Sequence, residues 1–538
     1  MTYTEIKERE EKKYYYRVKS IRKGEKIEKK RIYLGANLTK EQVKEREEKA
    51  DKELVLKNDV LEKKDEKEIT AGKDEFSEWF TQIMLKAELA DYTDVSGSIV
   101  FRPASYAIWE NIVKETDKKL KKLNIKNCYF PLFIPEKLLN KEKEHVKGFS
   151  PEVAWVTHTG KTKLSERLAV RPTSETIMYP SYSKWIRSWK DLPLKLNQWN
   201  NVVRWEFKHP VPFLRTREFL WNEGHTVYAT EKEALAEGKP ILKLYQEVCE
   251  DYLALYGMIG RKTEKEKFAG AVFSEKIHYI MPNGKAIEGP CFHHDGQNFA
   301  KAYDIKFLDK DKKQKFAYQN TFAISTRMMG VMFAIHSDDK GLILPPNIAL
   351  NKIVIVPILF EKSKEKVLKK ARQLKSELSS FNTILDERDD YTPGFKFNEY
   401  ELKGIPLRIE IGPRDIEKNS VVVVRRDNGK KENIKISELD KKIPKLLEEI
   451  QFSLYEKSKK LFKSKIEKTT KLQELIEIIN NKKVGIIPLC KNIKCEELLK
   501  FKTKGVKTLF ISKEKISSEK CVICNKKADY FVYAGKSY

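Results

Sequence analysis

The chain is 538 residues long, which is more than one hydrophobic core supports, so we expect three or four domains. It contains no run of about eighteen apolar residues and no apolar leader, which argues against a membrane-spanning helix and a signal peptide and predicts a cytoplasmic protein without a membrane partner. The formal net charge of +27 favours a polyanionic partner, although a lysine-rich composition typical of AT-rich genomes would produce the same excess.

The first patterned stretch is residues 12–31, for which we predict two short strands that turn at Gly24. The stretch combines ten basic and two acidic residues with three tyrosines. Thr39 and Gln42 form a predicted capping box that opens a charged helix running to about residue 64. Basic residues interleaved with aromatic rings suit nucleic-acid binding, and a solvated appendage is the alternative. We therefore predict a basic N-terminal extension over residues 1–70.

Residues 71–345 are predicted to form the largest globular unit. Apolar residues follow helical spacing over residues 103–123. The strand predicted next, over residues 127–135, contains a proline, which suits a sheet edge because proline lacks an amide donor. This helix and edge strand either form a dimer contact or pack within one subunit. Residues 169–180 are interpreted as a polar loop between apolar flanks.

A strand, a loop and a returning strand are predicted between Val202 and Thr226. Side chains alternate along a strand, so Arg204 and Glu206 share one face of the first strand. Guanidinium groups match phosphate and carboxylate oxygens and stack on flat rings, so such a surface suits a planar anion such as a nucleotide. A hairpin held by ordinary salt bridges is the alternative. The side chains expected together on the returning strand are Arg215, Arg217, Phe219 and Trp221.

Two further patterns complete this unit. Residues 278–290 are predicted to form a hairpin that turns at Asn283-Gly284. Residues 321–339 are predicted to run from a strand into a helix, with Arg327 in the first turn and Gly330 allowing close backbone approach. Strands outnumber helices and lie in hairpins, which predicts an α+β domain built on a largely antiparallel sheet.

The last two segments have a different pattern. Strands and helices alternate over residues 346–450, which predicts a small α/β domain with a turn at Pro393-Gly394. Residues 451–538 hold a lysine-rich helix, a further α/β stretch and four of the seven cysteines. In a reducing cytosol such a cluster favours a metal site over disulfides.

Two common nucleotide-binding motifs, GxxxxGK[ST] and GxGxxG, are missing from the sequence. An ATP-using enzyme with this sequence must therefore bind phosphates with arginines and magnesium. Arg204, Arg215 and Arg327 lie beside predicted strand or helix ends and suit this task, and a helix N-terminus adds a favourable dipole at Arg327.

Six stretches of the chain carry a resemblance to a known family: RPTSETIMYP, LNQWNNVVRWEFKHPVPFLRTREFLWNEGHT, GRKTEKEKFAGA, HHDGQNF, AYQNTFAISTRMMGV and GLILPP. They resemble prolyl-tRNA synthetases of the archaeal and eukaryotic type, which are class II aminoacyl-tRNA synthetases. The resemblance covers about residues 71–538. It implies an antiparallel catalytic domain, an anticodon-binding α/β domain and a zinc-binding C-terminal α/β domain. It also implies a homodimer that activates L-proline with ATP to prolyl-adenylate and transfers the prolyl group to tRNA(Pro).

The resemblance implies roles for individual residues as well. The expected catalytic residues are Arg204 for the α-phosphate and the proline carboxylate, Arg215 for the γ-phosphate and Arg327 for the adenine face. Positioning and electrostatics would carry adenylate formation, with magnesium neutralising the phosphates. The expected proline site consists of Thr173 and Glu175 for the imino group, Arg204 for the carboxylate, and Phe219, Trp221, His225 and His293 around the ring. The expected ATP site consists of Arg204, Glu206, Arg215, Thr216, Phe219, Glu288, Cys291, Ser325 and Arg327.

The chain departs from the family pattern between Glu288 and Phe292. Where the family commonly has Gln-Gly-Gly-Thr-Ser, this chain has Glu-Gly-Pro-Cys-Phe. Glu288 adds negative charge near the phosphates, Cys291 donates hydrogen bonds more weakly than threonine, and Pro290 with Phe292 would reshape the loop. We therefore expect weaker ATP binding or a lineage-specific loop. The alternative function is a catalytically weakened paralogue that binds tRNA or regulates.

The remaining implications concern metal, proofreading and the anticodon. Cys490, Cys495, Cys521 and Cys524 match the family's zinc-site spacing, and four thiolates indicate a structural Zn²⁺, with four unligated thiols as the alternative. About a hundred residues separate His225 from Ser325, which leaves no room for the editing insertion of bacterial-type relatives. Four polar residues of the anticodon-binding domain are candidates for reading base edges or for ordinary salt bridges: Arg408, Glu410, Arg414 and Asp415.

Overall fold

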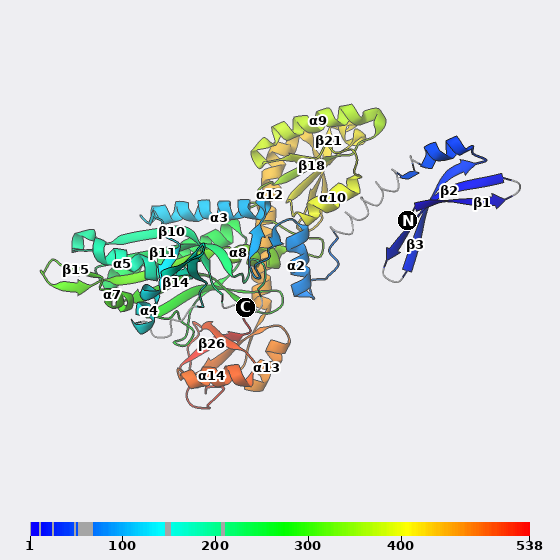
Figure 1. Cartoon of the computed structure of the whole chain (residues 1–538). Coiled ribbons are helices and arrows are strands. Elements are labelled where there is room, and N and C mark those ends of the chain that lie inside the picture. Colours follow the sequence, from blue (N-terminus) through cyan, green and yellow to red (C-terminus); the bar gives the residue numbers. More distant parts are fainter. Residues whose placement is uncertain are drawn as a thin grey trace. The chain divides into compact units, whose positions relative to one another are not determined.

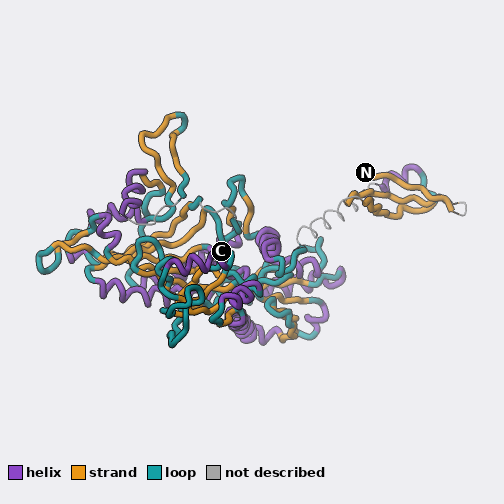
Figure 2. The backbone as a smooth tube through the Cα atoms, turned by 90° about the horizontal axis from the view of Figure 1, so that it is seen from below, coloured by secondary structure: helices purple, strands orange, loops and turns teal. Residues whose placement is uncertain are grey.

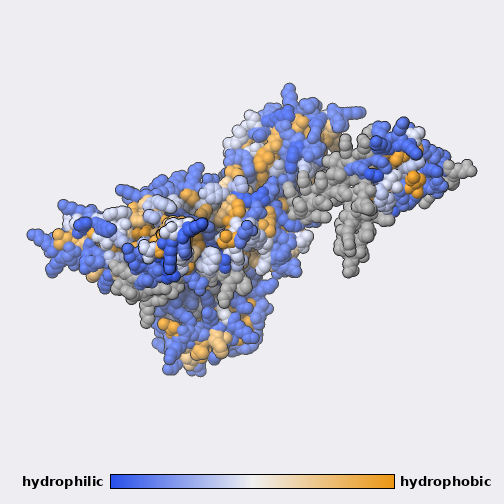
Figure 3. Space-filling view, in the orientation of Figure 1, coloured by the Kyte–Doolittle hydropathy of each residue, from blue (hydrophilic) through white to orange (hydrophobic). Residues whose placement is uncertain are grey.

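The computed structural model describes residues 2–9, 12–23, 26–47, 50–51, 68–145, 152–205 and 210–538. The chain divides into two compact units, Met1–Glu68 and Ile69–Tyr538 (Figure 1). Most residues on the visible face are hydrophilic (Figure 3), in keeping with a charged fraction of 34%. Glu206, expected in the ATP site, and the turn at Gly24 lie outside the described residues.

In the residues that the structure describes, the smaller unit is a three-stranded antiparallel sheet with a helix. Its strands are β1 (Thr2–Arg9), β2 (Lys12–Lys23) and β3 (Lys26–Ala36), seen in orange in Figure 2. The predicted strand pair is confirmed, but β1 was missed because TYTEIKER alternates short polar and charged residues with little apolar character. The predicted capping box is also confirmed: the Thr39 amide donates to Gln42 Oε1 at 3.1 Å, and the Gln42 amide donates to Thr39 Oγ1 at 3.3 Å. The continuation of this helix beyond residue 51 lies outside the described residues.

The larger unit is organised around a sheet that, in the described residues, has eleven strands in the order β23-β24-β26-β25-β12-β13-β14-β17-β11-β10-β6. All neighbours are antiparallel except β10–β6 and β23–β24, which confirms the predicted sheet type. The strands are β6 (Lys126–Asn127), β10 (Leu194–Val203), β11 (Glu218–Tyr228), β12 (Met258–Arg261), β13 (Phe273–Ile280), β14 (Ala286–Gly296), β17 (Tyr318–Ser325), β23 (Ile466–Lys468), β24 (Val484–Leu489), β25 (Lys507–Ile511) and β26 (Tyr530–Gly535).

Helices pack on this sheet and bury its apolar side chains. Gly330 in α8 allows the close approach that the sequence predicts, because a Cβ there would lie 2.8 Å from Leu214 Cδ2. In α3, Ile108, Ile112 and Leu120 are buried as their spacing predicts. The helices around the sheet are α2 (Phe76–Lys86), α3 (Pro103–Lys122), α4 (Glu136–His145), α5 (Glu175–Trp185), α6 (Glu231–Glu247), α7 (Asn298–Tyr303) and α8 (Arg327–His336).

Two predicted elements of this unit are wrong. The strand expected over residues 127–135 is two short strands, β6 and β7 (Phe133–Pro135), joined by a segment with Tyr129 exposed. The polar loop expected over residues 169–180 is shorter, because α5 begins at Glu175 and contains Pro180. Proline inside a helix removes one backbone hydrogen bond, but Tyr179 and Tyr182 are fully buried, and this packing outweighs the local preference.

Small strand groups lie around the central sheet. In the described residues, a three-stranded antiparallel sheet has the order β7-β9-β8, and two separate strand pairs are also present. The additional strands are β4 (Ala90–Tyr92), β5 (Ile99–Phe101), β8 (Trp155–Thr159), β9 (Thr162–Val170), β15 (Lys306–Leu308) and β16 (Gln314–Phe316).

The α/β domain that follows has a mixed five-stranded sheet in the order β19-β18-β20-β21-β22. The turn predicted at Pro393-Gly394 is instead the start of α10, with Pro393 in the first turn and Thr392 Oγ1 accepting from the Phe395 amide at 3.3 Å. Proline is well suited to this position because its missing amide hydrogen is not needed there. The elements are β18 (Ile353–Pro357), α9 (Lys364–Glu377), β19 (Ile384–Leu385), α10 (Pro393–Leu402), β20 (Leu407–Ile411), α11 (Pro413–Glu417), β21 (Ser420–Arg425) and β22 (Lys431–Lys435).

The C-terminal segment extends the central sheet. Helix α12 (Leu439–Ser464) runs through the boundary expected near residue 450 and connects the α/β domain to the last segment (Figure 1). Strand β25 then pairs with β12 at Ile511 and Arg261, so the last strands continue the central sheet. Helices α13 (Leu472–Asn480) and α14 (Ile493–Lys502) pack in this segment. Among the described residues, none of the helices has the length and apolar character needed to cross a membrane.

Candidate active site

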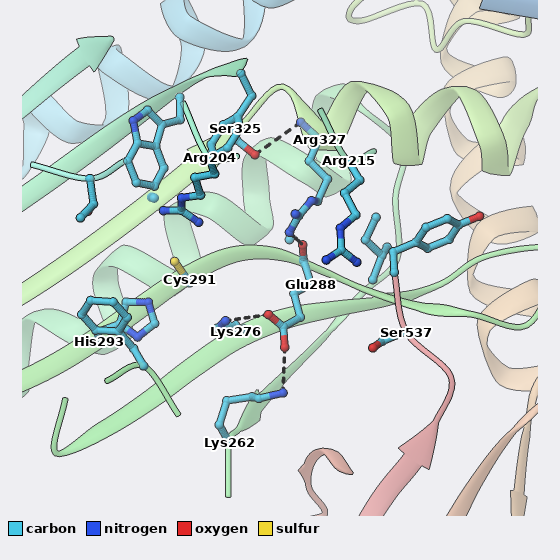
Figure 4. Close-up of a pocket in the computed structure, with 18 of the residues that line it drawn as sticks. Arg204, Arg215, Lys262, Lys276, Glu288, Cys291, His293, Ser325, Arg327 and Ser537 are labelled. Atoms are coloured by element: carbon cyan, nitrogen blue, oxygen red, sulfur yellow. Dashed lines mark hydrogen bonds and ion pairs between the residues drawn. The ribbon is translucent and has the colours of Figure 1, made fainter. Parts of the chain in front are cut away.

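A cavity of about 700 Å³ lies on one face of the central sheet (Figure 4). Its floor comes from β11, β14 and β17, and its walls come from the β10–β11 connection, the start of α5 and the last residues of the chain. Most of the predicted proline and ATP residues line it. They are Thr173, Glu175, Arg204, Arg215, Thr216, Phe219, Trp221, Glu288, Cys291, His293, Ser325 and Arg327.

Strand alternation builds the aromatic floor. Phe219, Trp221 and Glu223 are two residues apart on β11 and all line the cavity. Phe219 and Trp221 meet edge to face with their ring centroids 5.6 Å apart. Trp221 lies opposite Ser325 in the β11–β17 register. This pairing brings the predicted site residues of β11 close to those at the end of β17.

The arginines of the predicted strand pair lie outside the strands, because β10 ends at Val203 and β11 begins at Glu218. The connection nevertheless directs Arg204 over the floor, with its guanidinium carbon 5.4 Å from the centroids of both Phe219 and Trp221. Arg204 Nε also donates to the Pro172 carbonyl at 3.0 Å. This arrangement holds one cation at the same distance from two aromatic rings.

Arg217 does not lie on this face. The prediction that its side chain lies together with those of Phe219 and Trp221 is therefore wrong. Its guanidinium carbon lies 4.4 Å from the Trp205 ring centroid, and its Nη1 donates to the Ser96 carbonyl at 2.6 Å. The alternation rule fails here because Arg217 precedes the first residue of β11 and follows the path of the connecting segment.

Arg215 and Arg327 converge from two different elements (Figure 4). Arg215 closes a tight turn in which its amide donates to the Val211 carbonyl at 2.9 Å. Arg327, in the first turn of α8, donates from Nε to the Leu214 carbonyl and from Nη1 to the Glu288 carbonyl, both at 3.1 Å. Burial lowers the pKa of Arg327, and repulsion from Arg204 and Arg215 lowers it further. An anionic ligand would relieve that repulsion.

Glu288 lies between two lysines that sequence reasoning missed. Its carboxylate accepts from Lys262 Nζ at 2.8 Å and from Lys276 Nζ at 2.6 Å, and all three residues line the cavity (Figure 4). Burial acts to raise the pKa of Glu288, but Lys276 and then Lys262 hold it well below its usual range. The expected excess of negative charge is therefore not present, because the three side chains together carry one positive charge. Lys262 belongs to the GRKTEKEK stretch, whose basic character was the available signal.

A β-bulge explains how Glu288 and Cys291 both reach the cavity. Lys276 pairs with Cys291 while His278 pairs with Glu288, so β14 has one residue more than β13 between these pairs. Residues three apart on a regular strand would face opposite sides, and the extra residue reverses this. The bulge also accommodates Pro290, which has no amide hydrogen for the ladder. The stretch Glu288–Phe292 is thus a bulged strand rather than the expected loop.

The opposite end of the cavity is acidic. Glu223, which sequence reasoning missed, accepts from Thr173 Oγ1 at 2.8 Å and from the Ser174 amide at 2.9 Å. Burial acts to raise the pKa of Glu223, but hydrogen bonding to His225 and these donors lower it to about 2. Thr173 also contacts the Glu175 carboxylate, whose pKa is raised by burial. Thr173 has a single hydroxyl proton, so it can donate to only one of these two carboxylates.

His225 does not line the cavity, contrary to the expected proline wall. It is fully buried below Glu223, with Nε2 3.4 Å from Glu223 Oε1 and Nδ1 3.1 Å from the Tyr179 hydroxyl. The side chain lies on the cavity face of β11, but α5 covers that part of the strand. His293 does line the cavity, with Nδ1 2.7 Å from Ser274 Oγ. Burial lowers the pKa of His293 to about 3, so this imidazole is neutral at pH 7.

A second cluster lies in the C-terminal segment. The sulfur atoms of Cys490, Cys495, Cys521 and Cys524 are all within 4.8 Å of one another. The Sγ atoms of Cys490 and Cys524 are 3.8 Å apart, which matches two ligands about 2.3 Å from a tetrahedral zinc. The donor set and its geometry therefore fit a structural zinc ion.

Two of the residues considered for anticodon reading are occupied by other contacts. Arg408 and Glu410 are buried on β20 and form an ion pair of 3.0 Å. Arg408 is also paired with Glu401 at 2.9 Å. For these two residues the salt-bridge alternative agrees with the structure.

Three family models match the chain. They are a tRNA synthetase class II core domain (G, H, P, S and T) over residues 156–336, an anticodon binding domain over residues 352–446, and the C-terminal domain of prolyl-tRNA synthetase over residues 472–538. Proline–tRNA ligase 2 of Bacillus thuringiensis is 47% identical over 471 residues, which are 87% of this chain and 98% of that protein. This chain belongs to the prolyl-tRNA synthetase family. The catalytic domain is of class II, and the enzyme is a proline–tRNA ligase.

Other relatives agree with this membership. A putative proline–tRNA ligase of Saccharomyces cerevisiae is 46% identical over 495 residues, which are 86% of this chain and 72% of that protein. The crystal structure of prolyl-tRNA synthetase from Cryptosporidium parvum, complexed with halofuginone and AMPPNP, has a TM-score of 0.84 and 45% identity, and covers 88% of this chain and 99% of that chain. In this synthetase the segment between Tyr228 and Tyr318 supplies β12, β13 and β14 of the central sheet.

Proposed function

We propose that the enzyme activates L-proline with ATP and transfers the prolyl group to the 3′ end of tRNA(Pro). A proline carboxylate oxygen attacks the α-phosphorus and pyrophosphate leaves. A terminal ribose hydroxyl of the tRNA then attacks the carbonyl carbon of prolyl-adenylate, and AMP leaves. The observation that carries this proposal is the convergence of three arginines, two aromatic rings and an acidic end in one cavity. Such a cavity suits a substrate pair with one cationic end and a polyanionic end.

The acidic end is the proposed binding site for proline. The secondary ammonium of proline would donate to Thr173 and Glu175, with the ionised Glu223 providing further negative charge behind them. The cationic substrate favours the ionised form of Glu175, which opposes the effect of burial on its pKa. Trp221 and the neutral His293 would contact the pyrrolidine ring.

The basic end is the proposed site for ATP. Arg204 is positioned to bind both the proline carboxylate and the α-phosphate, because its guanidinium lies above Phe219 and Trp221. Arg215 would bind the γ-phosphate, and Arg327 would lie against the adenine. These cations would stabilise the charge that develops on the α-phosphate during attack.

Magnesium is proposed as the counter-ion of the ATP phosphates. The acidic side chain nearest to the arginine-rich end, Glu288, is already paired with Lys262 and Lys276. We therefore propose that the phosphates of ATP, rather than Glu288, hold this ion.

The four-cysteine cluster is proposed to hold a structural zinc ion. All four positions of a tetrahedral site would be filled by protein thiolates, which leaves no open position for catalysis. The ion would stabilise the fold of the C-terminal segment, whose strands continue the catalytic sheet.

We further propose that the enzyme is a cytoplasmic homodimer and that residues 346–450 bind the anticodon region of tRNA(Pro). The net charge of +27 favours tRNA as a partner, and the anticodon binding domain model supports this part of the proposal. Exposed aromatic side chains beside the β6 edge, including Tyr129 and Phe133, suit a subunit contact. Sedimentation analysis would test the dimer, and a monomer at micromolar concentration would refute it.

The test of the main proposal is proline-dependent exchange of pyrophosphate into ATP, followed by aminoacylation of tRNA(Pro). We expect both reactions with proline. Lack of exchange at millimolar ATP would refute the proposed activation step. Exchange without aminoacylation would refute only the transfer step.

A further inference from the structure

The N-terminal unit has a sheet whose two faces differ. The helix that begins after Thr39 packs on one face through charged contacts. Arg17 donates to both carboxylate oxygens of Asp51 at 2.8 and 2.6 Å and pairs with Glu47 at 3.2 Å, while Arg46 donates to the Leu34 carbonyl at 2.6 Å. This face is therefore occupied within the unit.

The other face carries a group of tyrosines, which we call the tyrosine face and define as Lys7, Tyr14, Tyr16, Arg31 and Tyr33. The strand register sets Tyr16 opposite Tyr33 and Lys7 opposite Tyr14, so these side chains share one side of the sheet. The Tyr33 ring centroid lies 5.3 Å from that of Tyr16 and 6.4 Å from that of Tyr14. Tyr33 is 53% exposed, so its ring is open to a partner.

Positive charge surrounds these rings. Lys7 Nζ lies 5.7 Å from the centroid of the Tyr16 ring. Arg31 pairs with Glu5 at 2.7 Å on the same face, and its side chain remains 41% exposed. Residues 12–36, which include the two strands that carry the tyrosines, contain ten basic and two acidic residues. The tyrosine face thus combines flat rings with the cations of Lys7 and Arg31, within a segment of the chain that is rich in basic residues.

We propose that the tyrosine face binds a single-stranded segment of RNA, with bases stacking on the tyrosines and the phosphates contacting the surrounding lysines and arginines. Aromatic rings spaced along a basic sheet are the usual means by which proteins bind unpaired bases without sequence preference. An acidic peptide would use the charges of this face but not its rings. RNA is the partner that uses both features. This inference goes beyond aminoacylation and concerns a surface separate from the cavity.

The test uses the full chain and two unlabelled competitors. Fluorescence anisotropy measures the affinity for a labelled oligouridylate, with tRNA(Pro) and with poly-glutamate as competitors, at several salt concentrations. Tyr33→Ser removes an exposed ring, so the fold is retained, while Tyr33→Phe keeps the ring and serves as the matched variant. Tyr92→Ser, which removes an equally exposed tyrosine from the other unit, is the control for general loss of aromatic surface.

We expect Tyr33→Ser to weaken oligouridylate binding at least about fivefold, and Tyr33→Phe and Tyr92→Ser to retain the original affinity. The affinity should also fall steeply with salt. Competition by tRNA(Pro) would show that the enzyme's own substrate uses the face, whereas oligouridylate binding that tRNA(Pro) does not displace would assign the face to other RNA. Equal loss in Tyr33→Ser and Tyr33→Phe, or equal binding of poly-glutamate, would overturn the proposal. Pyrophosphate exchange should be unchanged in every variant, so failure here is distinguishable from failure of the proposed activation step.

Discussion

Lys276→Met is expected to weaken ATP binding by exposing the charge of Glu288. Lys276 Nζ lies 2.6 Å from Glu288 Oε2, and its loss leaves Glu288 with Lys262 alone, so the cavity wall loses one positive charge. A unit charge about 8 Å from a phosphate contributes roughly 2 kcal/mol at an effective dielectric constant of about 20. This corresponds to a roughly 30-fold rise in the KM for ATP.

The measurement is proline-dependent pyrophosphate exchange over a range of ATP concentrations. Glu288→Gln alone should leave the KM for ATP unchanged or lower it, because it removes a negative charge. The double variant Lys276→Met with Glu288→Gln removes both charges of the pair and should recover most of the lost affinity. Lys195→Met, which removes a partly buried lysine of β10 outside the cavity, is the matched control and should have no effect.

Comparing the two single variants with the double variant distinguishes an effect of charge from an effect of structure on the KM for ATP. A KM for ATP that is unchanged in Lys276→Met would refute the argument that Lys276 compensates Glu288. A double variant as weak as Lys276→Met would show that the lysine acts through packing or through direct contact with ATP.

Three other predictions follow from the described contacts. Glu223→Gln should raise the KM for proline about tenfold or more with little change in the KM for ATP, because it removes the charge held beside Thr173 and Ser174; equal changes for both substrates in the exchange assay would contradict it. Cys495→Ser should reduce the zinc content, measured by elemental analysis, from about one ion per chain and lower the unfolding temperature, whereas a zinc-free wild-type enzyme would refute the metal site. Burial, with repulsion from Glu175, raises the pKa of Asp295 well above its usual range. The unfolded chain therefore releases this proton at lower pH than the folded chain. As the pH rises above about 4, the free energy of unfolding falls by at most about 1.4 kcal/mol per pH unit. Asp295→Asn should accordingly stabilise the enzyme more at pH 8 than at pH 5, and an equal shift in unfolding temperature at both values would contradict this.

Elements whose signal is local could be predicted from the order of residues. Helix α3 follows from apolar spacing, the hairpin of β13 and β14 from Asn283-Gly284, and the first turn of α8 from the change of pattern at Arg327. The family motifs also determined most of the cavity lining, because each motif places a fixed residue at a strand or helix end. These features depend on neighbours in the chain, so one sequence is sufficient to predict them.

Features that depend on contacts between distant segments became visible only in the folded chain. Lys262 and Lys276 are found beside Glu288 because a β-bulge rotates part of β14, and no local pattern reports a bulge of this kind. His225 does not line the cavity because α5 covers it, and Glu223 is the charged group of β11 that does. The C-terminal strands join the catalytic sheet through a single pairing of β25 with β12. Side-chain direction and strand partners are set by packing across the sheet, which is why these positions could not be read from the order of residues alone.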